Sequence, residues 1–379
     1  MAKEKVQSLY QSLPKLYPWF IGAICLYLGI RIRLWCNLAF HGESVLAVAL
    51  LMFLMFRLIT GHSKENLVAR NRVRTWLVGL STFFFIYLSM SVVVVDLFQL
   101  VYRQFVTDPV YRDLMLLKCG RICLVFVVGA GLLASWQKSR IRVVKTQIRR
   151  PGFGKEYHMV LLSDLHIGYY VGVKHIARMV EQVNALHPDI VVIAGDLVNA
   201  GNTRECPEID EVAKLLAQMR SREGTFAILG NHDPEMGDED FQKFLRDAQI
   251  TLLVDDIYTC SSCHLVGRNT RTRPRQTLGF LLGGVKHRRP VVVLDHDPFG
   301  VEEAVEQKAD LILCGHTHKG QVFPLNLFCR AVYSRQQFWG RSVVGETDVV
   351  VSAGTGYFSM PMRLGSSCEI WDLTLTGTE

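Results

Sequence analysis

The sequence predicts an α-helical membrane segment followed by an α/β domain, and three observations support this fold class. Several long apolar runs without charge precede Ile141, which is typical of membrane-spanning helices. From Ile141 onward, short β-rich runs alternate with stretches of helical periodicity, as in α/β folds. The charge divides at the same place, because residues 1–150 carry 20 Lys and Arg against 6 Asp and Glu, whereas residues 151–379 carry 22 against 29.

Four uncharged runs near the N-terminus are candidate membrane spans. Trp76–Val95 has 20 residues and can cross the bilayer core without help. Pro18–Ile30, Ser44–Phe56 and Ile122–Trp136 are shorter and reach spanning length only if flanking Lys and Arg side chains extend to the interface. Buried helices of a soluble core give runs of similar length, but one small core has little room for four. We therefore expect about four transmembrane helices in residues 1–140.

The distribution of Lys and Arg predicts the orientation in the membrane. With four spans, the N-terminal tail, the loop at residues 64–74 and the segment after Trp136 share one side and carry most of the basic residues. Basic flanking segments stay in the cytoplasm. We therefore expect an integral, multi-pass protein whose termini and α/β domain are cytoplasmic. The expected divisions are a membrane domain at 1–140, a basic juxtamembrane linker with the first strand at 141–155, and the α/β domain at 156–379.

The elements of the second half follow from its apolar patterns. Continuous apolar runs of four to six residues indicate buried strands, and apolar residues spaced three or four apart indicate helices. Val173–Leu186 has this helical spacing and stops before Pro188, as a helix should. The other expected helices are Glu208–Met219, Phe241–Ala248 and Glu302–Gln307. The expected strands are His158–Ser163, Asp189–Ala194, Thr225–Leu229, Thr251–Val254, Cys263–Gly267, Pro290–Leu294, Asp310–Leu313, Asp348–Ser352 and Glu369–Leu375.

Polar clusters follow five of these strands. The carboxyl ends of strands in α/β sheets border the crevice where sites form. A single cluster has an ordinary explanation, because Gly-Asp is a common turn and a lone His is commonly a core or surface residue. Five clusters in this order instead predict one site built from five loops. They are Asp164-Leu165-His166, Gly195-Asp196, Gly230-Asn231-His232-Asp233, His296 and Gly315-His316-Thr317-His318.

The residue types in the clusters indicate a centre for two metal ions. Mixed imidazole and carboxylate ligands favour Mn, Fe, Zn, Ni or Co over the all-oxygen shells of Ca and Mg. Two such ions acidify a bridging water and clamp the attacking and leaving oxygens of a displacement at phosphorus. We expect Gly195, Gly230 and Gly315 to let the backbone turn sharply beside the ions. The clusters therefore predict a phosphoester hydrolase.

The order of the clusters resembles that of the calcineurin-like metallophosphoesterases, whose pattern D-x-H, G-D, G-N-H-D/E, H and G-H-x-H is matched in full. The resemblance implies a four-layer α/β/β/α sandwich with a dinuclear site at its edge, most favourably for Mn. It also implies that His232 contacts the phosphate and protonates the leaving oxygen, with its ring oriented by Asp233. The implied ligands are Asp164, His166 and His318 for the first ion, Asp196 as the bridge, and Asn231, His296 and His316 for the second.

Stretches outside the motifs resemble a membrane-associated branch of this family and a group of UDP-diacylglucosamine diphosphatases. This resemblance implies a phosphodiesterase or pyrophosphatase that acts on a lipid-linked substrate at the membrane. Arg268 and Arg363 are candidates for bidentate contact with its phosphate, against the alternative that they are ordinary surface arginines. The stretches are Leu265–Arg268, Leu294–Pro298, Gly315–Pro324 and Arg363–Gly365.

Two other functions remain open: hydrolysis of soluble nucleotides or cyclic nucleotides, and a non-catalytic membrane scaffold. The intact ligand set disfavours the scaffold. The negative charge of residues 151–379 disfavours nucleic acid as a partner, because a nucleic-acid backbone requires a positive surface. Five aromatic residues after the last motif could form a lid, contact lipid, or pack a loop onto the core. They are Phe323, Phe328, Tyr333, Phe338 and Trp339.

Overall fold

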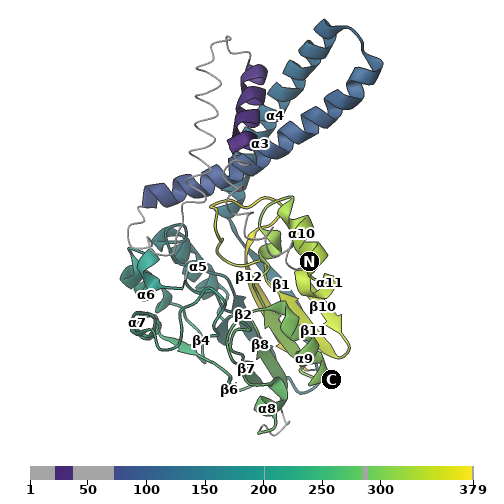
Figure 1. Cartoon of the computed structure of the whole chain (residues 1–379). Coiled ribbons are helices and arrows are strands. Elements are labelled where there is room, and N and C mark those ends of the chain that lie inside the picture. Colours follow the sequence, from purple (N-terminus) through teal and green to yellow (C-terminus); the bar gives the residue numbers. More distant parts are fainter. Residues whose placement is uncertain (1–21, 37–71, 200, 285–288, 378–379) are drawn as a thin grey trace, which may run out of the picture. The chain divides into compact units, whose positions relative to one another are not determined.

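The computed structural model describes residues 22–36, 72–199, 201–284 and 289–377, and the chain divides into two units at residues 1–133 and 134–379 (Figure 1). In the first unit, α3 (Arg72–Phe105) and α4 (Pro109–Lys138) are long and apolar enough to cross a membrane, by length and composition. α3 contains the expected span Trp76–Val95, and α4 contains Ile122–Trp136. Residues 22–36 form another helix, whereas Ser44–Phe56 lies outside the described residues.

The turn between α3 and α4 follows from its sequence. Pro109 disfavours helical backbone at the residue before it, so a helix rarely runs through this point, yet proline fits the first turn of the next helix. Asp108 satisfies one free amide there, because the Val110 N–H donates to its Oδ1 at 2.8 Å. Within the same unit, Asp96 of α3 forms an ion pair with Arg31 and accepts a hydrogen bond from the Tyr27 hydroxyl. Such pairing is required of charges in apolar surroundings.

Two six-stranded sheets form the centre of the second unit, in the orders β1-β12-β2-β3-β4-β5 and β10-β11-β9-β8-β7-β6. The pairs β2–β3, β3–β4 and β8–β9 are parallel, so their carboxyl ends reach the same edge of each sheet. The strands of the first sheet are β1 (Ile141–Arg149), β2 (Tyr157–Leu162), β3 (Ile190–Ile193), β4 (Thr225–Ala227), β5 (Ile250–Leu252) and β12 (Cys368–Thr376). Those of the second are β6 (Asp256–Thr259), β7 (His264–Gly267), β8 (Val291–Leu294), β9 (Leu311–Cys314), β10 (Gly340–Val344) and β11 (Thr347–Val351).

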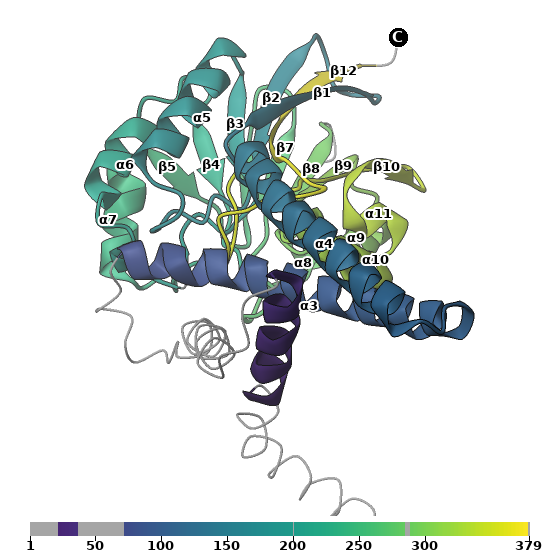
Figure 2. The ribbon, with the colours of Figure 1, turned by 90° about the horizontal axis from the view of Figure 1, so that it is seen from above.

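Helices cover the outer face of each sheet, and the expected four-layer sandwich is confirmed. α5 (Val173–Ala185), α6 (Ile209–Leu216) and α7 (Glu239–Asp247) share an apolar core with the first sheet and lie together on one flank in Figure 2. A second core fills the space between the sheets. A third lies between the second sheet and α8 (Leu278–Leu282) and α9 (Val301–Glu306).

Part of the basic segment after α4 is the edge strand β1, which pairs in parallel with β12. Arg142, Lys145 and Arg149 are exposed along it. Charged side chains on an edge strand oppose pairing with another chain. The remaining elements are α10 (Leu325–Val332) and α11 (Arg335–Phe338), with short 3-10 turns η2 (Thr203–Glu205), η3 (Pro298–Gly300) and η4 (His318–Gly320).

Candidate metal centre

The five predicted clusters lie where parallel strands end: after β2, β3 and β4 in the first sheet and after β8 and β9 in the second. The backbone there is unusual, because five predicted ligands have φ between 47° and 72°. Residues other than glycine rarely adopt positive φ, and such strain persists where the surrounding structure over-determines it, often at functional sites. The five are Asp164, His166, Asp196, His316 and His318.

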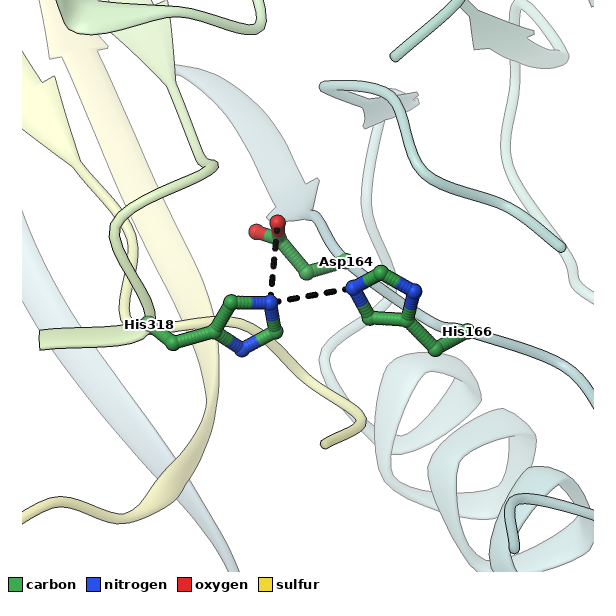
Figure 3. A group of neighbouring side chains, drawn as sticks. All are labelled: Asp164, His166 and His318. Atoms are coloured by element: carbon green, nitrogen blue, oxygen red, sulfur yellow. Dashed lines mark hydrogen bonds and ion pairs between the residues drawn. The ribbon is translucent and has the colours of Figure 1, made fainter. Parts of the chain in front are cut away.

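The first group of candidate ligands comprises Asp164, His166 and His318, which come from both sheets. Each offers one ligand atom, and these atoms all lie within 4.8 Å of one another. The His318 Nε2 atom is 3.0 Å from His166 Nε2 and 3.5 Å from Asp164 Oδ1. Figure 3 shows the carboxylate and both rings converging on one point. All three side chains are buried, so water offers them little competition.

The second group comprises Asp196, His296 and His316, whose ligand atoms also lie within 4.8 Å of one another. Asp196 connects the two groups, because its Oδ2 atom is 3.2 Å from His296 Nε2 and 3.6 Å from His166 Nε2. Asn231 adds an oxygen, with its Oδ1 atom 3.1 Å from His296 Nε2. The structure thus brings the seven predicted ligands together, with Asp196 in the bridging position.

The three glycines of the motifs leave room for ligands. A Cβ atom at Gly230 would lie 2.1 Å from Asp196 Oδ1, and one at Gly315 would lie 2.4 Å from Asp164 Oδ2. Neither position has positive φ, so the expectation of a sharp turn is wrong for these two. Gly195 does have it, at φ 83°, and a Cβ there would lie 2.7 Å from His296 Nδ1. Gly230 and Gly315 are therefore explained by the lack of room for a side chain. Gly195 is explained both by the lack of room and by its positive φ.

The protonation states of the side chains suit metal binding. Burial lowers the pKa of His166 to about 3 and that of His316 to about 4, so both imidazoles are neutral at pH 7 with a lone pair available. Burial also acts to lower the pKa of His296, but the carboxylate of Asp196 outweighs it and raises that pKa to about 10. A metal ion bound by His296 would have to displace this proton, which would couple metal affinity to pH.

The hydrogen bonds around the ligands orient some of them. His296 Nδ1 donates to the Ala194 carbonyl at 2.7 Å, which directs Nε2 into the site. His166 Nδ1, in contrast, is buried without a hydrogen-bond partner in the described part of the chain. Buried, neutral imidazoles beside carboxylates are the donor set that divalent transition metals prefer. Two such ions therefore fit the residues present.

His232 lies beside the two groups and belongs to neither. Its ring is half-buried, with its centre 5.3 Å from that of His166. The expected contact with Asp233 is not found. Asp233 instead accepts the backbone amides of Gly230 at 2.8 Å and Val198 at 3.0 Å, so it holds the loop rather than the ring. The expectation that Asp233 orients the His232 ring is therefore wrong in this structure.

Phe358 is an aromatic neighbour of the site that sequence reasoning missed. Its ring centre is 4.5 Å from that of His232, 5.0 Å from that of His166 and 6.4 Å from that of His318. It belongs to the loop after β11, a sixth strand that ends near the site. The sequence feature that could have indicated this loop is the expected strand Asp348–Ser352, which a run of small residues follows.

Arg268 and Arg363, the two candidates for phosphate contact, are fully buried. Arg268 forms an ion pair with Glu303 at 3.1 Å. The Arg363 Nη2 atom donates to the carbonyls of Ala353 at 2.7 Å and Gly356 at 2.6 Å. Neither side chain has an exposed guanidinium for a substrate, so the structure gives each of them a role in holding loops.

Comparison with known proteins gives a consistent result. A family model described as "Calcineurin-like phosphoesterase" matches residues 157–320. A "Transmembrane protein with metallophosphoesterase domain" from Bos taurus is 33% identical over 274 residues, which cover 65% of this chain and 59% of that protein. The protein of the same name from Danio rerio is 33% identical over 264 residues, with the same coverage of 65% and 59%. The chain thus spans less than two thirds of the length of these relatives.

Among solved structures, a 5'-nucleotidase precursor from Thermus thermophilus is 16% identical. Its TM-score is 0.35, and the match covers 58% of this chain and 55% of that one. So distant a likeness supports no conclusion about substrate.

Proposed function

Because the model of the calcineurin-like phosphoesterases matches residues 157–320, we propose that this protein is a hydrolase that cleaves phosphoester bonds with two divalent metal ions. The observation that carries the proposal is the position of Asp196, whose Oδ2 atom lies 3.2 Å from His296 Nε2 in its own group and 3.6 Å from His166 Nε2 in the other. A carboxylate between two imidazole-rich groups suits a pair of ions that share one bridging ligand. Mn²⁺ is the ion we favour, with Fe, Zn, Ni and Co as alternatives of similar ligand preference.

The chemistry divides between the ions and the chain. Bound at this site, two divalent ions lower the pKa of a water molecule and offset negative charge on phosphoryl oxygens. The chain holds the ligand atoms in place with buried side chains and a strained backbone, so little reorganisation accompanies the reaction. Asp196 uses Oδ1 to accept the His232 amide at 2.8 Å, which leaves Oδ2 for the ions.

His232 is the proposed general acid. Its ring lies against Phe358 and within 5.3 Å of the His166 ring, beside the site without joining either ligand group. A leaving alkoxide needs a proton, and the His232 ring can deliver one in its imidazolium form. Burial lowers the pKa of this ring, which makes the imidazolium a stronger acid. The Gly230–Asp233 loop that carries the ring is held by the Asp233 carboxylate rather than by a partner on the ring itself.

We further propose a substrate that resides in the membrane, either a lipid-linked diester or a lipid-linked pyrophosphate. Two observations support this: α3 and α4 have the length and composition of membrane spans, and two relatives are named as transmembrane proteins. A soluble nucleotide hydrolase gains nothing from such an anchor, whereas an enzyme of lipid phosphoesters gains proximity. Soluble nucleotides remain the alternative substrate class.

The test uses the full-length chain and bis-p-nitrophenyl phosphate. We expect hydrolysis that chelation abolishes and that Mn²⁺ restores better than Ca²⁺. Asp196→Ala should remove both activity and bound metal, as measured by elemental analysis. Undiminished hydrolysis in excess chelator contradicts the two-metal proposal, and absence of hydrolysis with every one of the five metals favours the scaffold.

A further inference from the structure

The second unit contains a cationic cavity that none of the proposed metal ligands lines. Its volume is about 760 Å³, within the ~300–1,000 Å³ of pockets that hold small molecules. β1, α10, α11 and β10 supply its walls, together with the residue after His318. Among the residues that the structure describes, no carboxylate lines it, and five of the lining side chains are cationic. These are Arg142, Lys319, Arg330, Arg335 and Arg341.

Four of the five charges form no ion pair with a carboxylate among the described residues, and three of these four have no ring contact either. Arg341 is paired, with its Nη2 atom 2.8 Å from Asp348 Oδ1, and the Lys319 ammonium lies 3.5 Å from the centre of the Trp339 ring. The remaining three, Arg142, Arg330 and Arg335, are exposed and form no ion pair with a carboxylate among the described residues. Guanidinium groups in this state bind phosphate oxygens by charge-assisted, bidentate hydrogen bonds.

α10, which forms part of the cavity wall, exposes apolar side chains beside it. None of its eight residues is buried. Leu327, Phe328 and Val332 are 55%, 68% and 66% exposed, and Arg330 on the same helix lines the cavity. A helix with an exposed apolar face and a flanking basic side chain is typical of segments that lie in the membrane interface. A soluble anion accounts for the arginines alone, whereas an anionic lipid accounts for the arginines and the apolar face together.

We propose that this cavity and the exposed face of α10 form a binding surface for anionic phospholipid, separate from the metal centre. The phosphate of the headgroup pairs with Arg330 and Arg335, while Leu327 and Phe328 enter the acyl boundary. The inference rests on the proposed function only for the location of the chain at a membrane. It adds a non-catalytic lipid site that holds the phosphoesterase domain against an anionic leaflet.

The test measures hydrogen–deuterium exchange of the full-length chain in lipid nanodiscs. We expect amides of residues 325–338 to exchange more slowly when phosphatidylglycerol is added to phosphatidylcholine. In the double variant Arg330→Gln with Arg335→Gln, the apparent affinity for the anionic lipid should fall roughly 30-fold, because the contributions of two basic residues near the surface add. The matched control, Arg220→Gln with Arg246→Gln, removes the same charge from exposed positions outside the cavity and should keep the protection.

The outcomes separate this site from the metal centre. Equal exchange with and without phosphatidylglycerol, or full protection in the cavity variant, overturns the lipid surface. Protection by soluble glycerol phosphate in phosphatidylcholine nanodiscs also overturns it and assigns the cavity to a soluble anion. Hydrolysis of bis-p-nitrophenyl phosphate by the same samples reports on the metal centre independently, and both double variants should retain it.

Discussion

Asp196 divides its two carboxylate oxygens between two tasks. Oδ1 accepts the His232 amide, and Oδ2 faces His296 and His166. Burial acts to raise the pKa of this carboxyl group, but the neighbouring imidazoles, His296 first, outweigh burial and hold the pKa well below its ordinary value. The group is therefore ionised at neutral pH, as a bridging ligand must be.

Substitution of His232 tests the assignment of the acid. His232→Ala should keep both metal ions, because the ring belongs to neither ligand group, yet lose about 10²–10⁴-fold in rate, the usual contribution of a positioned general acid. The loss should be smaller with p-nitrophenyl leaving groups, which depart without a proton. The measurement compares aryl and alkyl diesters at equal metal content. An equal loss on both substrates shows that His232 has another role.

Substitution of Gly230 tests the position of the Asp196 carboxylate. Gly230→Ala places a methyl group 2.1 Å from Asp196 Oδ1, so the bridging carboxylate must move. We expect lower metal content and loss of activity, measured by elemental analysis and bis-p-nitrophenyl phosphate hydrolysis. Gly237→Ala is the matched control, because a Cβ there meets nothing within 4 Å. Normal metal content in Gly230→Ala would mean that the carboxylate relocates freely.

Among the secondary-structure elements, the strands that precede the predicted ligands could be predicted from the sequence. Continuous apolar runs such as Asp189–Ala194 indicate strands buried on both faces, and the structure has β3 at Ile190–Ile193. Which strands pair was not predictable, because β12 joins the first sheet between β1 and β2 from the far end of the chain. The elements that escaped prediction are β6, β10, α8 and α11, which have five residues or fewer, and α10, whose apolar side chains are exposed rather than packed in a core.

The candidate site was predictable for a related reason. Ligand types are visible in sequence, and strand ends converge by topology, so the two groups of ligands follow from the motifs. The partner of Asp233 and the burial of Arg268 and Arg363 depend on loop packing instead. The neighbouring positions of His232 and Asp233 suggest that their side chains pair. Backbone amides compete for the same carboxylate oxygens, and in this structure Asp233 accepts hydrogen bonds from the amides.

An ion-pair network between the sheets gives a prediction about stability. Asp348 of β11 is buried and accepts from Arg150, after β1, at 2.7 Å and from Arg341 of β10 at 2.9 Å. Asp348→Asn should cost about 2 kcal/mol, less than the ~3–5 kcal/mol of a fully buried pair, because the arginines are partly exposed. The midpoint of thermal unfolding measures this. Asp247→Asn, which breaks an exposed pair with Lys243 on α7, should leave the midpoint unchanged, because water screens exposed pairs.

For the whole molecule, orientation in the membrane is a separate proposal that reporters can test. The basic residues at 64–74 and 138–150 predict a cytoplasmic location for both segments. A reporter after Glu379 and one in the 64–74 loop should therefore report the cytoplasm. A reporter near Thr107, between α3 and α4, should report the opposite side. An external C-terminus contradicts both the orientation and a cytoplasmic site of catalysis.

The anchor itself gives the last prediction, which concerns substrate choice. The end of α4 belongs to the second unit, because the Ala134 carbonyl accepts the Arg363 amide at 3.1 Å and the Lys138 ammonium lies 5.5 Å from the centre of the Tyr357 ring. A deletion should therefore stop at residue 133 to keep these contacts. Without residues 1–133, turnover of a lipid-linked diester in a bilayer should fall about 10²-fold or more, because the anchor no longer raises the effective concentration of the site.

The soluble substrate is the internal control for this deletion. Hydrolysis of bis-p-nitrophenyl phosphate should need the proposed metal ligands, which all lie within residues 164–318, and should gain nothing from proximity to lipid. It should therefore survive deletion of residues 1–133, and a loss of both activities would instead indicate misfolding of the shortened chain. If lipid turnover is undiminished while the soluble activity persists, or if the full-length chain cleaves soluble nucleotides alone, the membrane segment does not serve substrate capture. Proximity is the one advantage that the anchor offers a hydrolase, so the ratio of the two activities before and after deletion decides between the lipid-linked and the soluble substrate class.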